Sequence, residues 1–433
     1  MNLENKIKQL ISKDSKYIWH PCTQMKDMES FNIMPIARGE GVYLYDFYGN
    51  KYIDCISSWW VNLFGHNNEY ISAKLKEQID RLEHVIFAGY THEGIVNLSE
   101  RLISLLPQSL SKCFYADNGS SAIEIAIKMS HHLNILKNHN KNIFLSLQNS
   151  YHGETIGALS LGSVGIYKDV YKNILIQNIQ TPLPKDFSEE SINQTLQELK
   201  NVISKNKNQI CAFVLEPLVQ CAGGMNIYPK EFVKKACEIC KENEIYVIFD
   251  EIAVGFGRSG EMFALEECEI EPDFLCLSKG ITGGYLPLSA VITNDNIYNA
   301  FYGDYERAFL HSHSYTGNPL AVACANATLD IFQTQNIISK NKVLSEFIFD
   351  KFLELNEFKN VMNLRKKGMI FAFDLVGDYE RTISLEFSSL ALKNGLIIRP
   401  LGNVVYFMPP YIISKEQVCF VVDGIKNILK VLN

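Results

Sequence analysis

Two charged residues, Asp250 and Lys279, each follow a short run of apolar residues. Asp250 comes directly after residues 245–249, and Lys279 comes after residues 274–277 and one serine. Short apolar runs of this kind are typical of buried parallel strands. In open α/β sheets the reactive groups gather where the strands end. The pattern therefore predicts a carboxylate and an amine at one edge of a sheet, although a structural ion pair or two unrelated strand-end charges would look the same.

A buried carboxylate and a buried lysine in this arrangement suit pyridoxal phosphate. Lys279 would form a Schiff base with that cofactor, and Asp250 would keep its pyridine nitrogen protonated. Both residues are therefore candidate catalytic and cofactor-binding residues.

A phosphate-binding segment is predicted after the apolar run at residues 112–116. Gly119 would let the backbone approach a ligand closely, and Ser120 and Ser121 suit the N-cap of a helix over residues 122–136. Free N–H groups at the start of a helix bind phosphate. An ordinary capped helix without a ligand would have the same sequence.

Aromatic and acidic residues follow two further apolar runs. Tyr151 lies just beyond the expected strand 144–147, and Glu216 follows the expected strand 211–215. An aromatic ring at a strand end can stack on a planar cofactor, although core packing is the commoner role of a single tyrosine. Candidate phosphate, stacking, acid and lysine groups thus all come after strands, as one site at the carboxyl edge of a sheet requires.

Two other motifs compete with this interpretation. Residues 255–260 match G-x-G-x-x-G, which is typical of dinucleotide binding, but residues 250–254 separate them from the strand and no long helix is expected to follow. Cys237 and Cys240 form a C-x-x-C within a helical pattern, with no second pair nearby, which argues against zinc or redox use. We therefore expect no metal.

Composition and charge indicate a globular protein without nucleic-acid or membrane partners. The chain has 433 residues, of which 47% are hydrophobic and 21% charged, and its net charge of −7 does not favour binding to a polyanion. The N-terminus lacks the apolar core of a signal peptide, and no apolar run approaches the roughly 20 residues of a membrane span. The eleven cysteines show no paired framework. We expect a cytoplasmic location.

The order of elements predicts a doubly wound, mainly parallel α/β sheet. Helical patterns and apolar runs alternate from about residue 68 to 330. Before this region, residues 42–46 and 51–55 flank a Gly-Asn turn and form an expected hairpin.

The pattern of expected secondary structure changes after a helix that begins near Asn318. Short strands are expected at residues 369–374, 397–398 and 404–408, alternating with helices. We therefore expect a large α/β domain over residues 61–325, and a smaller α+β domain made of residues 1–60 and 326–433.

Four segments together resemble the class III pyridoxal-phosphate aminotransferases. They are Asp250-Glu251-Ile252, residues 255–260, Pro272-Asp273 and Ser278-Lys279-Gly280. The signature is long and specific, and the similarity extends over nearly the whole chain. The resemblance implies the fold-type I architecture, an aminotransferase with pyridoxal 5′-phosphate as cofactor, and a homodimer with active sites at the subunit interface.

Within this class, further segments resemble the branch that aminates 8-amino-7-oxononanoate in biotin biosynthesis. They are residues 19–21, 57–60, 151–153, 216–220, 317–320, 398–402 and 406–411. General ω-amino-acid aminotransferases share the lysine region, and one of these remains the alternative. The paired tryptophans at 59 and 60 and the segment 399–411 are more particular to this branch.

The resemblance also implies a role for each candidate cofactor residue. Lys279 would be the Schiff-base lysine and proton shuttle, Asp250 would pair with the pyridine nitrogen, and Tyr151 would cover the ring. All three are expected to be catalytic residues. Gly119 and Ser120 would bind the phosphate.

A second phosphate contact is expected from the other subunit. The resemblance implies that Ser314 of the partner subunit supplies a phosphate-binding hydroxyl, with His313 beside it.

The substrate pocket is expected to combine aromatic residues with one guanidinium. Arg399 would meet the carboxylate of the keto acid, for which its bidentate geometry is suited. The residues expected to contact substrate are Cys22, Trp59, Trp60, Tyr151, Ser312, Arg399 and Tyr406.

Three departures from the family pattern bear on the amino donor. Cys22 stands where a well-known branch has a tyrosine, Glu154 replaces an aspartate, and residues 311–316 look more like a branch that can use lysine. S-adenosylmethionine is the favoured donor, because its sulfonium cation is attracted to the aromatic faces of Trp59 and Trp60. Lysine is the alternative.

Overall fold

The computed structural model describes the chain except residues 1, 32, 207, 378–381 and 433. Two compact units are formed. The larger unit comprises Glu69–Val343 and Lys366–Ile370, and the smaller one comprises Met1–Asn68, Leu344–Arg365 and Phe371–Asn433.

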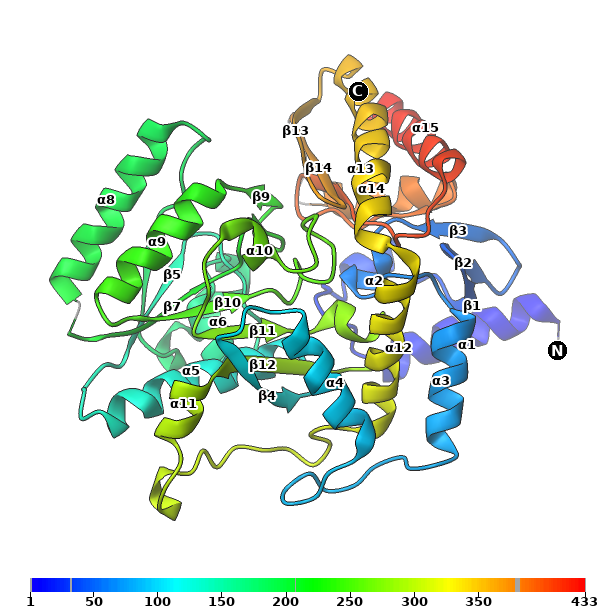
Figure 1. The fold of residues 1–433 in the computed structure, drawn as a ribbon. Coiled ribbons are helices and arrows are strands. Elements are labelled where there is room, and N and C mark those ends of the chain that lie inside the picture. Colours follow the sequence, from blue (N-terminus) through cyan, green and yellow to red (C-terminus); the bar gives the residue numbers. More distant parts are fainter. Residues whose placement is uncertain (1, 32, 207, 378–381, 433) are drawn as a thin grey trace. The chain divides into compact units, whose positions relative to one another are not determined.

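The larger unit is built on a seven-stranded sheet (Figure 1). In spatial order its strands are β4 (Leu110–Ala116), β12 (Ser289–Asn294), β11 (Phe274–Leu277), β10 (Tyr246–Asp250), β7 (Ile210–Leu215), β5 (Ile143–Leu147) and β6 (Asn178–Thr181). Strand β12 runs antiparallel to β11 and β4, whereas the other described pairs are parallel. Strands β7 and β11 are buried along their whole length, which explains their unbroken apolar sequences. The expected doubly wound, mainly parallel sheet is confirmed.

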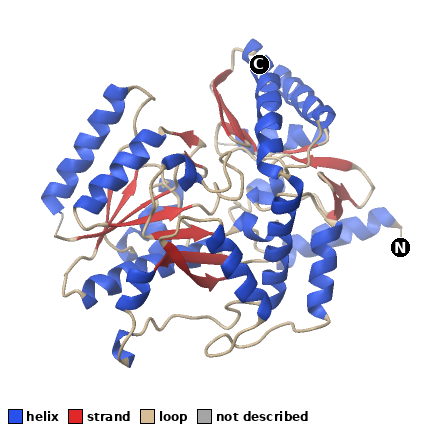
Figure 2. Cartoon of the chain, viewed as in Figure 1, coloured by secondary structure: helices blue, strands red, loops and turns tan. Residues whose placement is uncertain are grey.

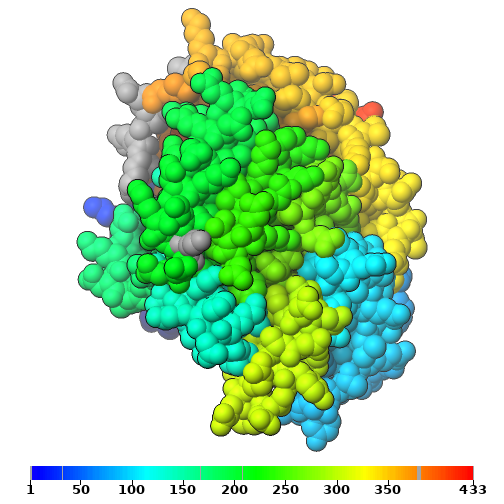
Figure 3. Space-filling model, turned by 60° about the vertical axis from the view of Figure 1, so that its left-hand side comes forward, coloured from blue at the N-terminus to red at the C-terminus, as the bar shows by residue number. Residues whose placement is uncertain are grey.

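Helices cover both faces of this sheet (Figure 2). Helix α5 packs against β12, β11 and β7, while α9 packs against β10 and α8; Figure 3 views the unit from the side of α8 and α9. The helices of the larger unit are α3 (Glu69–Ile79), α4 (Glu93–Ser104), α5 (Gly119–Leu136), α6 (Ile156–Leu161), α7 (Gly165–Lys168), α8 (Glu189–Asn206), α9 (Lys230–Glu242), α10 (Ala264–Cys268), α11 (Asp295–Ala300) and α12 (Pro319–Gln335). A small hairpin of β8 (Val219–Gln220) and β9 (Asn226–Ile227) follows β7.

The parallel strands place the loops after β5, β7, β10 and β11 at one edge of the sheet. Asp250 is the last residue of β10 and lies opposite Cys276 of β11 in the parallel register. Lys279 follows a few residues later, at the start of a short 3-10 helix, Lys279–Thr282. The two residues singled out by the sequence thus leave neighbouring strands at the same edge.

The smaller unit contains two sheets. One has the order β1 (Ile36–Glu40), β2 (Tyr43–Asp46), β3 (Lys51–Asp54) and β15 (Leu396–Ile397), and the other has β13 (Val361–Lys367), β14 (Ile370–Leu375) and β16 (Val404–Phe407). The expected hairpin is the antiparallel pair β2–β3, and its turn is made possible by Gly49 at φ +87°. The helices are α1 (Leu3–Tyr17), α2 (Ser57–Trp60), α14 (Ile383–Lys393), α15 (Lys415–Val431) and the part of α13 (Ile337–Leu353) from Leu344 onward.

The units divide the chain later than the expected domain boundaries at 60/61 and 325/326. Helix α12 packs along α3 and α4, so it belongs with the larger unit. The division falls instead after Asn68 and within α13, after Val343. Among the described residues, no helix combines the length and the apolar character that crossing a membrane requires.

Candidate active site

Asp250 is buried at the end of β10, with 4% of its surface exposed. Its Oδ1 accepts a hydrogen bond from the Ile252 backbone N–H at 3.1 Å, and its Oδ2 lies 2.8 Å from His152 Nδ1. Because a carboxylate can only accept, Nδ1 of His152 carries the proton of this bond. The pair therefore presents a carboxylate that is fixed in orientation.

His152 lies in the turn after β5, directly beside Tyr151. The histidine is 2% exposed, and its Nε2 has no hydrogen-bond partner in the part of the chain that the structure describes. No sequence pattern predicted a role for His152. The one sequence feature that could have identified His152 as a site residue is its position next to Tyr151, after a strand.

Glu216 directly follows β7 and accepts hydrogen bonds from two loops at this edge of the sheet. Its Oε1 accepts from the Tyr151 backbone N–H and its Oε2 from the Cys221 backbone N–H, each at 3.1 Å. Burial raises the pKa of Glu216 to about 7; His152 lowers that pKa and the charge of Asp250 raises it. Sequence alone identified Glu216 as a strand-end acid, but not as the residue that holds the Tyr151–His152 turn.

Lys279 begins the 3-10 helix after β11 with φ +46°, a left-handed conformation that is uncommon for a residue with a side chain. Burial lowers the pKa of its ammonium group, while the charges of Cys221, Asp250 and Glu216 act in the opposite direction. A lysine with a lowered pKa is more often neutral, and a neutral amine is the nucleophilic form.

The residues at the start of α5, Gly119 and Ser120, pack tightly against Gly153 and Ile252, and we call this arrangement the cradle. The N-cap of α5 differs from the expected one. Asn118 is the N-cap, and its side chain accepts from the Ser121 N–H at 3.0 Å. The expectation that Ser120 or Ser121 caps this helix was wrong, because the asparagine one step before Gly119 already occupies the capping position. Ser120 instead accepts from the Glu154 N–H at 3.1 Å.

Two glycines leave no room for side chains in this cradle. A Cβ on Gly119 would lie 2.9 Å from Ile252, and a Cβ on Gly153 would lie 1.9 Å from Ser120 Oγ. Gly153 also has φ +122°, which favours glycine. The loops after β4, β5 and β10 therefore meet around Ser120, at the first N–H groups of an 18-residue helix.

Tyr151 is held at both ends. Its hydroxyl donates to Glu154 Oε1 at 3.0 Å, and its ring packs edge-on against Tyr167 at 5.9 Å. Glu154, noted in the sequence as a departure from the family pattern, thus fixes the ring that is expected to cover the cofactor.

The loop before α12 carries Ser312, His313 and Ser314. His313 Nδ1 lies 3.3 Å from Asp117 Oδ2, beside the cradle, whereas Ser312 and Ser314 are exposed. The role of Ser314 across a subunit interface stays a prediction.

The expected substrate residues of the smaller unit form a cluster of their own. The Arg399 guanidinium lies over the Trp59 ring at 4.8 Å and donates to the Cys22 backbone carbonyl at 2.9 Å. Trp60 is buried and packs edge-on against Tyr406 at 5.9 Å. Tyr406 is 1% exposed, so within the chain it supports Trp60.

The cluster presents one cation and one aromatic face. Trp59 is 40% exposed and Arg399 is exposed as well. This pairing can meet a carboxylate and an apolar chain together.

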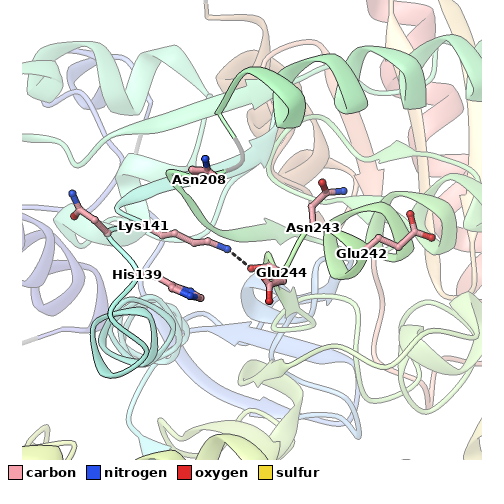
Figure 4. Close-up of a pocket in the computed structure, with 7 residues that line it drawn as sticks. His139, Lys141, Asn208, Glu242, Asn243 and Glu244 are labelled. Carbon is pink, nitrogen blue, oxygen red and sulfur yellow. Dashed lines mark hydrogen bonds between the residues drawn. The ribbon is translucent and has the colours of Figure 1, made fainter.

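A polar pocket of about 380 Å³ lies at the opposite edge of the large sheet (Figure 4). The Lys141 side chain extends across the pocket, and its Nζ donates to the Glu244 carbonyl at 2.6 Å. Asn208 also lines the pocket. These residues precede β5, β10 and β7, so the pocket is separate from the carboxyl-edge residues. In the described part of the chain, no cluster of three or more His, Cys, Asp or Glu residues is arranged to hold a metal.

Comparisons with known proteins were consistent with one another. The family model for aminotransferase class-III matches residues 24–429. An adenosylmethionine-8-amino-7-oxononanoate aminotransferase from Helicobacter pylori is 55% identical over 428 residues, covering 97% of each chain. The crystal structure of the enzyme of that name from Methanocaldococcus jannaschii has a TM-score of 0.93 at 35% identity, covering 98% of this chain and 99% of that one. An amine transaminase from an uncultivated Pseudomonas species, in a PLP-bound form, has a TM-score of 0.91 at 28% identity, covering 96% and 99%.

Proposed function

Because this chain belongs to the class-III aminotransferases, which are enzymes dependent on pyridoxal phosphate, we propose that it transfers an amino group from S-adenosylmethionine to 8-amino-7-oxononanoate. The product is 7,8-diaminononanoate, and the reaction belongs to biotin biosynthesis. Support comes from the full-length similarity to enzymes with that name. The structural observation that carries the proposal is the fixed carboxylate of Asp250, on the strand next to that of Lys279.

The described residues fit pyridoxal phosphate. The cradle at Gly119 is too tight for a Cβ and opens at a helix start, which suits a phosphate group. Asp250 would hold the pyridine nitrogen, Tyr151 would cover the ring, and Lys279 would anchor the cofactor covalently through Nζ. When bound, the cofactor supplies an electron sink for the pair left behind as the substrate loses a proton.

Lys279 moves that proton. Burial lowers the pKa of its amine, so Nζ can accept the proton from the carbon that bears the donor's amino group. Nζ would release that proton again within the same half-reaction, and in the second half-reaction it would deliver a proton to the acceptor carbon that receives the amino group.

Asp250 and His152 set the charge beside the ring nitrogen. The Nδ1 hydrogen bond from His152 and the N–H of Ile252 hold both carboxylate oxygens, so their position costs no reorganisation during the reaction.

The cluster of the smaller unit binds substrate. Arg399 pairs with the carboxylate of 8-amino-7-oxononanoate, and Trp59 and Trp60 line the chain and the donor's sulfonium cation. Cys22 and Tyr406 belong to the same cluster of the smaller unit, and Ser312, on the loop before α12, is a further proposed substrate contact.

The enzyme works as a homodimer in the cytoplasm. Exposed apolar side chains gather between α11 and α12, where Tyr302, Tyr305, Leu310 and Tyr315 are 60–79% exposed, which fits burial against a second copy. In that dimer Ser314 of the partner subunit reaches the phosphate, and this chain's own His313 lies beside the cradle, 3.3 Å from Asp117. All eleven cysteines are unpaired, as a reducing compartment would keep them.

A donor comparison tests the proposed function. The purified protein should be yellow, and S-adenosylmethionine should convert the bound cofactor to its amine form in a single turnover. Adding 8-amino-7-oxononanoate should then restore the original spectrum. Conversion by lysine and not by S-adenosylmethionine would replace the donor, whereas turnover only with simple ω-amino acids and keto acids would replace the substrate class.

A further inference from the structure

The segment Ser57–Trp60 forms one turn of left-handed helix. Its four residues have φ values of +48°, +46°, +73° and +73°. The Trp60 N–H donates to the Ile56 carbonyl at 2.8 Å, and the Val61 N–H donates to the Ser57 carbonyl at 3.0 Å. Each residue has a Cβ, so this conformation is unfavourable by itself and must be held by its surroundings.

Asp54, at the end of β3, is the main support of the turn. Its carboxylate is fully buried and accepts from the Ser58 N–H at 3.0 Å and from the Ser58 hydroxyl at 2.7 Å. The Ile56 N–H also donates to it at 3.3 Å. At the other side of the turn, the Ser57 hydroxyl donates to the Met408 carbonyl at 2.7 Å.

His66 holds Asp54 in turn. Its Nε2 lies 2.9 Å from Asp54 Oδ2, and its Nδ1 lies 3.1 Å from Asn62 Nδ2. With the asparagine amide donating to Nδ1, the proton of the imidazole is on Nε2 and is donated to Asp54.

The backbone of His66 is locked as well. It exchanges two hydrogen bonds with Gly41, at 2.7 and 3.0 Å, and its side chain lies where a Cβ on Gly39 would be. The histidine therefore has little freedom to leave Asp54.

The turn carries the two tryptophans of the substrate cluster. Trp59 is the ring beneath Arg399, and Trp60 packs on Tyr406. In a left-handed turn successive side chains point in directions that a right-handed turn would not give, so the directions of both rings depend on the turn.

We propose that Asp54 and His66 are positioning residues for substrate binding: together they hold the left-handed turn that aims Trp59 and Trp60. This inference rests on the proposed function, in which both tryptophans bind substrate. Asp54 and His66 do not touch the reacting atoms.

Four variants and one control test the proposal in the holoenzyme. Asp54→Asn places an amide N–H₂ against two donors, the Ser58 hydroxyl and His66 Nε2–H. His66→Ala removes the support, while His66→Gln can restore a donor near Nε2. Gly39→Ala pushes the imidazole without touching the turn, since its Cβ would lie 2.7 Å from the Cβ of His66.

The matched control is Asp46→Asn. Asp46 also accepts several hydrogen bonds, from Tyr48, Asn50 and Tyr52, but it is the last residue of β2, where the chain enters the β2–β3 turn. Its loss should affect stability without affecting the tryptophans.

The first readout is acrylamide quenching of tryptophan fluorescence in a Trp19→Phe background, where residues 59 and 60 are the only tryptophans. Asp54→Asn, His66→Ala and Gly39→Ala should increase quenching, and His66→Gln should restore it in part. The second readout is steady-state kinetics. KM for 8-amino-7-oxononanoate should rise roughly ten- to a hundredfold, with a smaller change in kcat and an unchanged cofactor spectrum.

Unchanged quenching and KM in Asp54→Asn would overturn the proposal, as would equal changes in Asp46→Asn. A fall in kcat alone would also overturn it, because a binding platform acts through KM. If the wild-type protein does not turn over 8-amino-7-oxononanoate, the proposed function fails, but the quenching series still decides whether Asp54 and His66 hold the turn.

Discussion

The sheet edge next to Asp250 and Lys279 and the tryptophan cluster of the smaller unit are held by different kinds of structure. Asp250 ends β10, and Lys279 follows the end of the neighbouring parallel strand β11, whose Cys276 pairs with Asp250 in the sheet register. Trp59 and Trp60 sit on a strained turn that depends on a buried carboxylate and a histidine. The proposed chemistry therefore depends on neighbouring strands of a buried sheet, whereas the proposed substrate recognition depends on a local polar network that single substitutions can disturb.

Removing the amine at the sheet edge should have the largest effect. Lys279→Ala should reduce turnover by roughly 10⁴-fold or more, because the proposed mechanism uses this lysine both to anchor the cofactor and to move the proton. The visible absorbance of the wild-type holoenzyme should be lost, while circular dichroism stays that of a folded protein. Lys141→Ala is the matched control, since the pKa of Lys141 is also lowered by burial but this residue lies at the opposite edge. Near wild-type turnover in Lys279→Ala would contradict the assignment of Lys279 as the catalytic lysine.

Asp250→Asn should come next. The amide keeps the shape but not the charge, and it should cost roughly 10²–10³ in the rate of the half-reactions with only a modest loss of cofactor. Stopped-flow absorbance measures this directly. Asp273→Asn serves as control, because this carboxylate accepts from Val247 at the other end of the strand and should affect stability without slowing the reaction. A full-rate Asp250→Asn enzyme would mean that the charge beside the ring is not needed.

The third effect is a pH dependence from the same edge. Burial raises the pKa of Glu216 from its usual value to about 7, so the folded protein binds a proton there that the unfolded chain has already released. The stabilisation from this proton is fully present below about pH 4.5 and is lost as the pH rises through about 7, for a total of roughly 3 kcal/mol.

Urea unfolding between pH 5 and 9 measures this slope. Glu216→Gln should remove the part of the slope that ends near pH 7. Glu251→Gln should act at higher pH, because burial raises the pKa of Glu251 to about 8. Identical pH profiles in the wild type and Glu216→Gln would show that Glu216 does not titrate in this window.

The sheet edge could be predicted from the sequence because its signals are local. Apolar runs ending in Asp250, before Lys279 and before Tyr151 identify buried strands, and parallel strands bring their ends together. The N-cap was misplaced by competition between neighbouring polar residues, since Asn118, Ser120 and Ser121 all suit that role.

The smaller unit could be predicted less well. The pair Trp59–Trp60 was visible, but its left-handed turn was not, because nothing in two serines and two tryptophans predicts four positive φ angles. The supports, Asp54 and His66, come from a strand end and a loop with no recognisable spacing between them. Polar networks of this kind depend on tertiary contacts and escape patterns based on sequence periodicity.

Arg399→Ala should sharpen the contrast between the two regions. Losing a charge-assisted pair costs about 1.5–3 kcal/mol, so KM for the keto acid should rise roughly ten- to a hundredfold. The donor half-reaction should change much less, because Arg399 is proposed to bind the carboxylate of 8-amino-7-oxononanoate and not the α-carboxylate that S-adenosylmethionine also carries. Single-turnover absorbance separates the two half-reactions, and Arg399→Lys should keep part of the binding. Equal damage to both half-reactions would make Arg399 structural or shared between both substrates.

The smallest effect is expected at Cys22. Its backbone carbonyl accepts from Arg399 at 2.9 Å, and a change of side chain leaves that contact in place. The backbone is already at φ +48° with a non-glycine residue, so Cys22→Tyr adds no new backbone requirement.

A tyrosine ring near Arg399 and Trp59 would add aromatic surface for a sulfonium cation, worth about 0.5–1 kcal/mol at an exposed position. KM for S-adenosylmethionine should therefore fall roughly two- to fivefold, while Cys22→Ala, which removes the thiol without adding a ring, should leave it unchanged. Initial rates at fixed 8-amino-7-oxononanoate measure both. A higher KM in Cys22→Tyr would show that this position does not face the donor as an aromatic contact.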